Sequence, residues 1–215
     1  MTRAQEPQTR NGSGPGVRWL VAGLGNPGEK YQNTRHNAGF LVIDRLAESY
    51  GIDLLQPGPD PQVLWAKGTV GAVPVVLAKP LAYMNRSGPP VRRLADELHI
   101  PVEAVMVVHD DVDLAFGRIK IKEKGGDGGH RGVMSLMEAF GRDDFVRLRI
   151  GIGRPAANRS VTDHVLSGFS PEEEALLDPV LDRACQAAAA AIRFGAAAAM
   201  NRFNTKEAHT HQVNS

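Results

Sequence analysis

Apolar runs of strand length alternate along this chain with segments that have the period of an amphipathic helix. The runs cover residues 17–23, 63–70, 73–79, 104–110, 117–122 and 146–152. Several are apolar without interruption, as in strands that are covered on both faces. The helical segments are 37–50, 87–100, 131–141 and 171–195. This alternation predicts an α/β fold with a largely parallel or mixed sheet flanked by helices.

The last helical segment carries the clearest signals for both of its ends. Ser170 is a preferred N-cap residue, Pro171 suits the first turn, and three glutamates follow at the positive end of the helix. Gly195 is typical of a helix stop. We therefore expect this helix to end at Gly195.

Domain organisation is simple. The 215 residues, 42% of them hydrophobic, suffice for one domain with a sizeable core. No linker or repeat interrupts residues 17–204, which we expect to form that single domain. The polar, Gly- and Pro-rich residues 1–16 are predicted to be a disordered leader, and residues 205–215 a flexible tail.

Charge and cysteine content limit the class of protein. The formal net charge is +1, so any basic surface for a nucleic acid must be local. The single cysteine, Cys185, excludes an intramolecular disulfide and is consistent with a reducing compartment. No apolar run approaches the roughly 20 residues of a membrane span, and the start lacks the apolar core of a signal peptide. We expect a cytoplasmic protein without a membrane segment.

The stretch VAGLGNPG at residues 21–28 has the G-x-G-x-x-G spacing of a dinucleotide-binding turn. Such a turn continues directly into an apolar helix, and an acid that binds the ribose follows about 20 residues later. Here the apolar helix begins only near Asn37, and Asp44 lies within it. The context therefore argues against a dinucleotide site.

His36 and three acids stand near predicted strand ends, where α/β proteins build their sites. A histidine there can act as a general base, or it can simply satisfy a hydrogen bond at a helix start. Asp110, Asp111 and Asp113 follow a strand, and each can orient the imidazole. The acids can also bind a divalent metal or solvate a loop, but neither a calcium loop nor a matching histidine pair is present.

Two further polar segments belong to the candidate site. Asn85 follows the strand 73–79, and its amide can donate to a carbonyl or hold a water. The glycine-rich segment 122–133 opens a helix and can either bind an anion or only cover the site. Basic residues that suit phosphate contacts, or that form a solvated face, lie around this loop and near the strand 146–152. They are Lys120, Lys122, Lys124, Arg131, Arg147, Arg149 and Arg154.

Five ordered motifs resemble those of bacterial-type peptidyl-tRNA hydrolase, and the resemblance spans roughly residues 18–204. They are GLGNPGEKYQNTRHNAGF, KPLAYMNRSG, VVHDDVDLAFGRIKIK, GGDGGHRG and RLRIGIGRP. The resemblance implies a monomeric single-domain α/β protein with a twisted mixed β-sheet. It also implies a hydrolase that cleaves the ester between a peptide and the 3′-terminal ribose of tRNA, without cofactor or metal. Such an enzyme recycles tRNA from prematurely released peptidyl-tRNA.

The resemblance assigns roles to individual residues. His36 matches the base that activates water, and Asp110 matches the carboxylate that orients it. The positions that match substrate-binding and lining residues are Asn26, Tyr31, Met84 and Asn85. Lys122 and Arg149, with Lys120 as a helper, match the residues that hold the 5′-terminal phosphate of tRNA. The glycines before Asn26 are then expected to present this asparagine and to let the tRNA end approach closely.

One position departs from the family pattern. Arg131 replaces an asparagine that helps to bind the peptidyl part, and Lys124 stands where glycine is common. Arginine is larger, permanently charged and only a donor. Arg131 is counted with the substrate-binding residues. Pointing inward, it is expected to help keep His36 neutral, and so available as a base, but to crowd the peptide groove; pointing outward, it is expected to add a phosphate contact. The alternative function is a non-catalytic or weakly active RNA-binding paralogue on the same scaffold.

Overall fold

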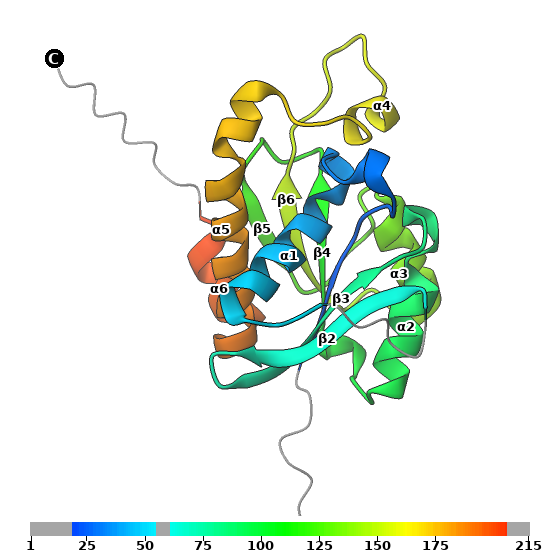
Figure 1. Cartoon of the computed structure of the whole chain (residues 1–215), viewed down its shortest axis with the longest axis vertical. Coiled ribbons are helices and arrows are strands. Elements are labelled where there is room, and N and C mark those ends of the chain that lie inside the picture. Colours follow the sequence, from blue (N-terminus) through cyan, green and yellow to red (C-terminus); the bar gives the residue numbers. More distant parts are fainter. Residues whose placement is uncertain (1–18, 55–60, 206–215) are drawn as a thin grey trace, which may run out of the picture.

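The computed structural model describes residues 19–54 and 61–205, so the predicted leader at 1–16 and residues 206–215 of the predicted tail lie outside the described part. Within the described residues, six strands form one sheet in the order β2-β3-β1-β4-β6-β5 (Figure 1). The strands are β1 (Trp19–Gly23), β2 (Val63–Val70), β3 (Val73–Pro80), β4 (Val105–Asp111), β5 (Ile119–Lys122) and β6 (Val146–Gly151).

The directions of the strands make the sheet mixed, as predicted. β3, β1, β4 and β6 run parallel to one another, whereas the edge strands β2 and β5 pair antiparallel with β3 and β6. The carboxyl ends of the four central strands therefore meet at one edge of the sheet, where α/β proteins place their ligands.

Helices account for most of the remaining described chain. The α-helices there are α1 (Ala38–Tyr50), α2 (Gly88–Glu97), α3 (Arg131–Phe140), α4 (Val161–Val165), α5 (Pro171–Phe194) and α6 (Ala196–Phe203). Short 3₁₀ helices are η1 (Glu29–Tyr31), η2 (Arg35–Asn37), η3 (Met84–Arg86) and η4 (Val102–Ala104). No helix in the described ranges is long and apolar enough to cross a membrane.

The four predicted helices are present, but two helices were not predicted. α5 begins with the expected cap: the Ser170 hydroxyl accepts from the Glu173 amide at 3.2 Å, and the Glu173 carboxylate accepts from the Ser170 amide at 2.8 Å. Gly195 does end α5, with a φ of 90°, yet α6 begins immediately after it. The predicted end of this helix at Gly195 is therefore confirmed, whereas α6 was not predicted. The second unpredicted helix, α4, has only five residues.

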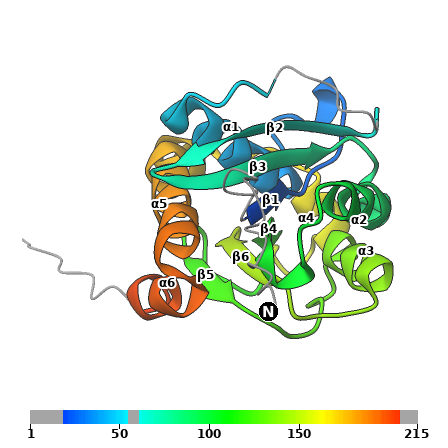
Figure 2. The same ribbon diagram turned by 90° about the horizontal axis from the view of Figure 1, so that it is seen from below.

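The helices cover both faces of the sheet. α1, α5 and α6 lie on one face and α2 and α3 on the other (Figures 1 and 2). Adjacent residues of β1 alternate between the two cores: Val21 packs with the first group, and Leu20 and Ala22 pack with the second. Burial on both faces explains why the strands read as uninterrupted apolar runs.

Two glycines of the VAGLGNPG turn allow α1 to pack closely against the sheet. A Cβ on Gly23 would lie 2.3 Å from the carbonyl oxygen of Gly39 in α1, and a Cβ on Gly25 would lie 2.6 Å from the ring of Phe40. Gly39 in turn lies against the backbone of β4, because its Cβ would meet the Val108 oxygen at 2.3 Å. Gly23 and Gly25 thus serve helix packing, a role that the sequence analysis did not assign to them. This contact also brings His36, two residues before α1, close to the end of β4.

Candidate active site

A cavity of about 810 Å³ opens at the carboxyl edge of the parallel strands. Each central strand contributes to its lining: Asn26 follows β1, Met84 follows β3, Asp110 lies in β4 and Arg154 follows β6. His36, from η2, completes the wall. Residues far apart in the sequence thus converge on one site.

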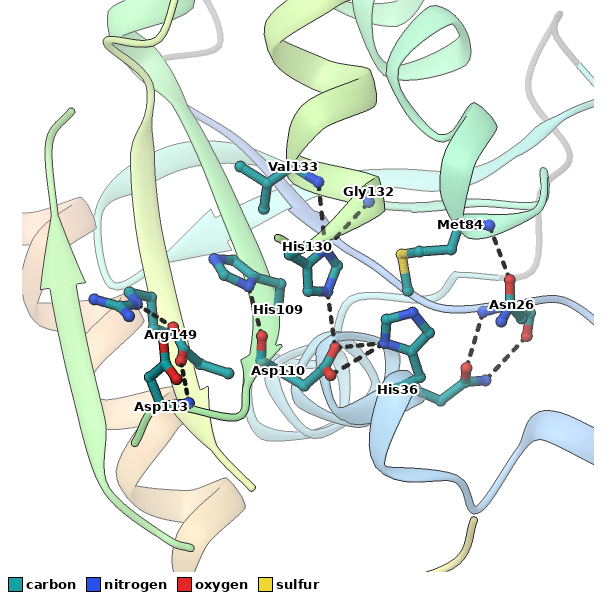
Figure 3. A network of polar contacts seen from close by, with 12 residues as sticks. Asn26, His36, Met84, His109, Asp110, Asp113, His130, Gly132, Val133 and Arg149 are labelled. Carbon is teal, nitrogen blue, oxygen red and sulfur yellow. Dashed lines mark hydrogen bonds and ion pairs between the residues drawn. The ribbon is translucent and has the colours of Figure 1, made fainter. Parts of the chain in front are cut away.

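His36 and Asp110 form a hydrogen-bonded pair in this wall (Figure 3). The His36 Nδ1 lies 2.9 Å from Oδ1 and 3.1 Å from Oδ2 of Asp110, whose side chain is only 2% exposed. A carboxylate can only accept, so Nδ1 carries the proton and Nε2 keeps a free lone pair. The arrangement leaves Nε2 able to accept a proton from a bound molecule.

His130 is a second histidine on the same carboxylate, and sequence reasoning missed it. Its Nδ1 accepts from the backbone amides of Gly132 and Val133 at 3.2 and 3.3 Å, so that its side chain caps α3 (Figure 3). The tautomer with the proton on Nε2 follows, and this N–H donates to Asp110 Oδ1 at 2.9 Å. The start of α3 thus holds Asp110 in place.

The charge of Asp110 is stabilised by this pair of histidines. Burial alone would raise the pKa of the carboxyl, but the hydrogen bonds and electrostatic attraction from His130 and His36 outweigh it and hold the pKa well below its ordinary value. Asp110 is therefore a carboxylate near neutral pH, and it can orient His36 and stabilise its protonated form.

His109 packs behind this cluster and remains neutral. Burial chiefly, assisted by the neighbouring His130, lowers the pKa of His109 to about 3. Its Nδ1 donates to the carbonyl oxygen of Asp110 at 2.7 Å, and its ring meets that of His130 edge-on at 4.7 Å between centroids. His109 therefore supports His130 from the side away from the cavity.

The three groups His36, Asp110 and His130 also bring their possible metal-ligand atoms within 4.8 Å of one another. The protonation pattern argues against a resident metal. The His130 Nδ1 is occupied as a helix cap, so its Nε2 must keep the proton and cannot offer a lone pair. The donor set favours a hydrogen-bonded cluster.

Asn26 is fixed so that its amide nitrogen stays available. Its Oδ1 accepts from the Met84 amide at 2.8 Å. The backbone of Asn26 is itself held by Asn37, whose Oδ1 accepts from the Asn26 amide at 2.8 Å and whose Nδ2 donates to the Asn26 carbonyl at 3.0 Å. Sequence reasoning did not assign a role to Asn37, which ties the turn after β1 to the start of α1.

Arg35 anchors the segment that presents His36. Its buried guanidinium donates to the hydroxyl of Ser167 at 2.6 Å, to the carbonyl of Gly168 and to the carboxylate of Glu173. These contacts join η2 to the chain that leads into α5. The position of His36 thus depends on residues more than 130 positions away.

The remaining predicted lining residues differ in their placement. Asn85 and Arg131 are exposed and line the cavity. Tyr31 does not belong to the lining; its ring lies outside, with the Lys30 ammonium 4.8 Å from the ring centroid. The sequence grouped Tyr31 with the other four lining residues, and the structure separates it from them.

The other two acids after β4 have partners of their own. Asp111 pairs with Arg149, and Asp113 pairs with Arg154 at 2.6 Å. Of the three acids, Asp110 is the one that contacts His36 in the described residues.

The predicted phosphate-binding residues lie on one face of β5 and β6. Lys120 stands opposite Arg149 and Lys122 opposite Arg147 in the antiparallel register. In the described chain neither lysine has an ion-pair partner, whereas Arg149 is paired with Asp111. Arg147 is buried and donates to the carbonyl of Gly125 at 2.7 Å, so it holds the glycine-rich loop.

The fold and the site together are those of an α/β protein whose cavity holds a histidine–aspartate pair with a geometry suited to general base chemistry. The family model of peptidyl-tRNA hydrolase matches residues 20–211. The peptidyl-tRNA hydrolase of Clostridium novyi (strain NT) is 42% identical over 186 residues, covering 86% of this chain and 97% of that protein. The one from Bacillus subtilis (strain 168) is 43% identical over 187 residues, covering 87% and 98%.

A solved structure agrees with these relatives. The crystal structure of peptidyl-tRNA hydrolase from Acinetobacter baumannii matches with a TM-score of 0.82 at 37% identity, covering 90% of this chain and 98% of that chain. This chain therefore belongs to the peptidyl-tRNA hydrolase family.

Proposed function

We propose that this protein hydrolyses the ester bond between the peptide and the tRNA in peptidyl-tRNA, and thereby recycles tRNA from prematurely released peptidyl-tRNA. The observation that carries the proposal is the pair of histidines on Asp110 at the wall of an open cavity. Family membership and the names of the relatives support the same activity.

In this mechanism His36 is the general base. Its Nε2 takes a proton from a water molecule, and the resulting hydroxide attacks the ester carbonyl carbon. The tetrahedral intermediate then expels the 3′ oxygen of the ribose, which receives the proton from His36. Asp110 keeps the imidazole in the required tautomer and stabilises its charged form between the two transfers.

The substrate-binding roles follow from the lining of the cavity. The Asn26 Nδ2 and the exposed amide of Asn85 offer donors to the ester or the ribose, and Met84 supplies an apolar wall. Arg131 faces the same space. Tyr31 lies outside this cavity, so we assign it a contact with substrate that extends beyond the reacting end.

The 5′-terminal phosphate of the tRNA is assigned to the face of β5 and β6. Lys120 and Lys122 carry charges without ion-pair partners in the described part of the chain, as expected of phosphate ligands. Arg149 shares its guanidinium with Asp111, so a phosphate there would use its remaining donors. We further propose that the protein acts as a cytoplasmic monomer.

The alternative, a non-catalytic or weakly active RNA-binding paralogue, rests on Arg131 and Lys124 alone. The match to the family model does not favour this alternative. His36, Asp110 and Asn26 also have a geometry suited to catalysis.

The direct test is to incubate the purified protein with N-acetyl-aminoacyl-tRNA and to measure the release of free tRNA beside His36→Ala and Asp110→Asn. We expect release by the native protein, with strong loss in both variants. Release that is absent or independent of His36 would overturn the proposal in favour of the RNA-binding alternative.

A further inference from the structure

The cations of the active-site cavity differ in whether they have partners. Three arginines line it: Arg131, Arg154 and Arg159. Arg154 pairs with Asp113 at 2.6 Å, and Arg159 donates to the carbonyl of Asp163 at 3.0 Å. Arg131, which is exposed, has no hydrogen bond or ion pair with any residue of 19–54 or 61–205. It is thus the lining cation whose donors remain free in the described structure.

The acids of the lining do not neutralise Arg131. Asp110 binds the two histidines, and Asp111 and Asp113 bind other arginines. Asp127, the lining acid nearest to Arg131 along the chain, accepts instead from the Gly129 amide at 2.6 Å. A guanidinium with all its donors free attracts a carboxylate by charge and by bidentate hydrogen bonding.

The position of Arg131 directs this charge to the reacting end of the substrate. It is the first residue of α3 and directly follows His130, which contacts Asp110. The backbone amides of Gly132 and Val133 at this helix start are already used by the His130 ring. The Arg131 side chain, not the end of the helix, is therefore the donor available to an anion here.

The rest of the cavity rim resembles a surface for a peptide. The exposed side chains of Tyr83, Val161 and Leu166 line it with apolar area, while Lys120 and Lys122 lie outside the lining. We propose that Arg131 is a specificity-determining residue that binds an acidic side chain of the peptide, so that the site prefers peptidyl-tRNA with Asp or Glu next to the ester. This inference rests on the proposed hydrolysis of peptidyl-tRNA.

The test compares two substrates that differ only in charge. N-acetyl-glutamyl and N-acetyl-glutaminyl esters are prepared on the same tRNA body, and kcat/KM is measured for each. We expect the native protein to prefer the glutamyl ester by about threefold to fivefold, the range of a partly exposed ion pair. Arg131→Gln should lower this ratio to about one. Arg131→Lys, which keeps the charge but loses the bidentate donors of the guanidinium, should give an intermediate ratio.

Lys124→Gln serves as the matched control, because Lys124 lies seven positions earlier in the same region, is exposed and is not part of the cavity lining. Its glutamyl-to-glutaminyl ratio should equal that of the native protein. A native ratio of one, or a ratio that Arg131→Gln leaves unchanged, overturns the proposal. An equal loss on both esters with a weaker salt dependence overturns it in favour of a tRNA phosphate contact. Failure of the proposed function is distinct, because neither ester would then be hydrolysed.

Discussion

His130 offers a sharp test of how the active site is held, because one side chain performs two separable tasks. Its Nδ1 caps α3, and its Nε2–H donates to Asp110. Asparagine is a preferred N-cap residue, but its shorter side chain does not reach as far as an imidazole. The His130→Asn variant therefore keeps the cap and loses the hydrogen bond, whereas His130→Ala loses both.

The expected magnitudes follow from the burial of Asp110. A hydrogen bond to a charged group contributes about 1.5–3 kcal/mol, and Asp110 is only 2% exposed, so water does not replace the lost donor. We expect His130→Asn to lower the free energy of unfolding by about 2 kcal/mol. His130→Ala should lose about 1 kcal/mol more through the missing cap. Because Asp110 then orients His36 less firmly, kcat/KM should fall about tenfold or more.

Urea denaturation and initial rates on N-acetyl-aminoacyl-tRNA measure the two effects. His99→Asn is the matched control: His99 is exposed and has a φ of 53°, a conformation that asparagine tolerates. This control should change stability by less than about 0.5 kcal/mol and leave the rate unchanged. If His130→Asn behaves like His99→Asn in both assays, His130 does not hold Asp110.

Three further variants test other parts of the site. Lys122→Ala should weaken hydrolysis of tRNA substrates but spare a short aminoacyl-nucleotide ester. Lys67→Ala, on the edge strand at the other side of the sheet, is the control, and equal losses of Lys122→Ala on both substrates would refute the phosphate contact. In the folded protein the pKa of His109 is lowered from its ordinary 6.5 to about 3. At pH values between these two, His109 is protonated in the unfolded chain but neutral in the folded protein. Stability should therefore fall by about 1.4 kcal/mol per pH unit as the pH drops below 6.5, and His109→Gln should remove that slope from urea titrations at pH 7 to 5. If the stability of His109→Gln depends on pH as steeply as that of the native protein, His109 is not buried in its neutral form. Arg35→Lys should destabilise the fold by about 3 kcal/mol and lower kcat. Arg45 pairs with the exposed acids Glu48, Asp178 and Asp182, so Arg45→Lys should cost under about 1 kcal/mol; similar losses would show that Arg35 does not anchor His36.

Much of the fold could be predicted from local signals in the sequence. Uninterrupted apolar runs marked strands buried on both faces, and the Ser170 cap marked the start of α5. The predicted helix end at Gly195 is confirmed, but α6 was missed, because a glycine with positive φ ends one helix without preventing another from starting at the next residue. α4 has only one turn and a correspondingly weak periodic signal.

The site was harder to predict where it depends on contacts between distant elements. His36 and Asp110 were identified through the resemblance of their motifs, and the structure places them in contact. His130 was overlooked because histidine is not a usual N-cap residue, and its bond to Asp110 depends on how α3 packs against β4. The pairing of Arg149 with Asp111 and the position of Tyr31 outside the cavity likewise depend on tertiary structure alone.

The central claim is that His36 Nε2 removes a proton from the attacking water, and chemical rescue tests it most directly. His36→Gly should reduce kcat/KM for N-acetyl-aminoacyl-tRNA by about a thousandfold and leave space for a small base. Added imidazole should then restore a measurable part of the rate, in proportion to the concentration of its neutral form. A His36→Gly variant that retains the native rate, or one that is folded and inactive but gains nothing from imidazole, would contradict the role of His36 as general base.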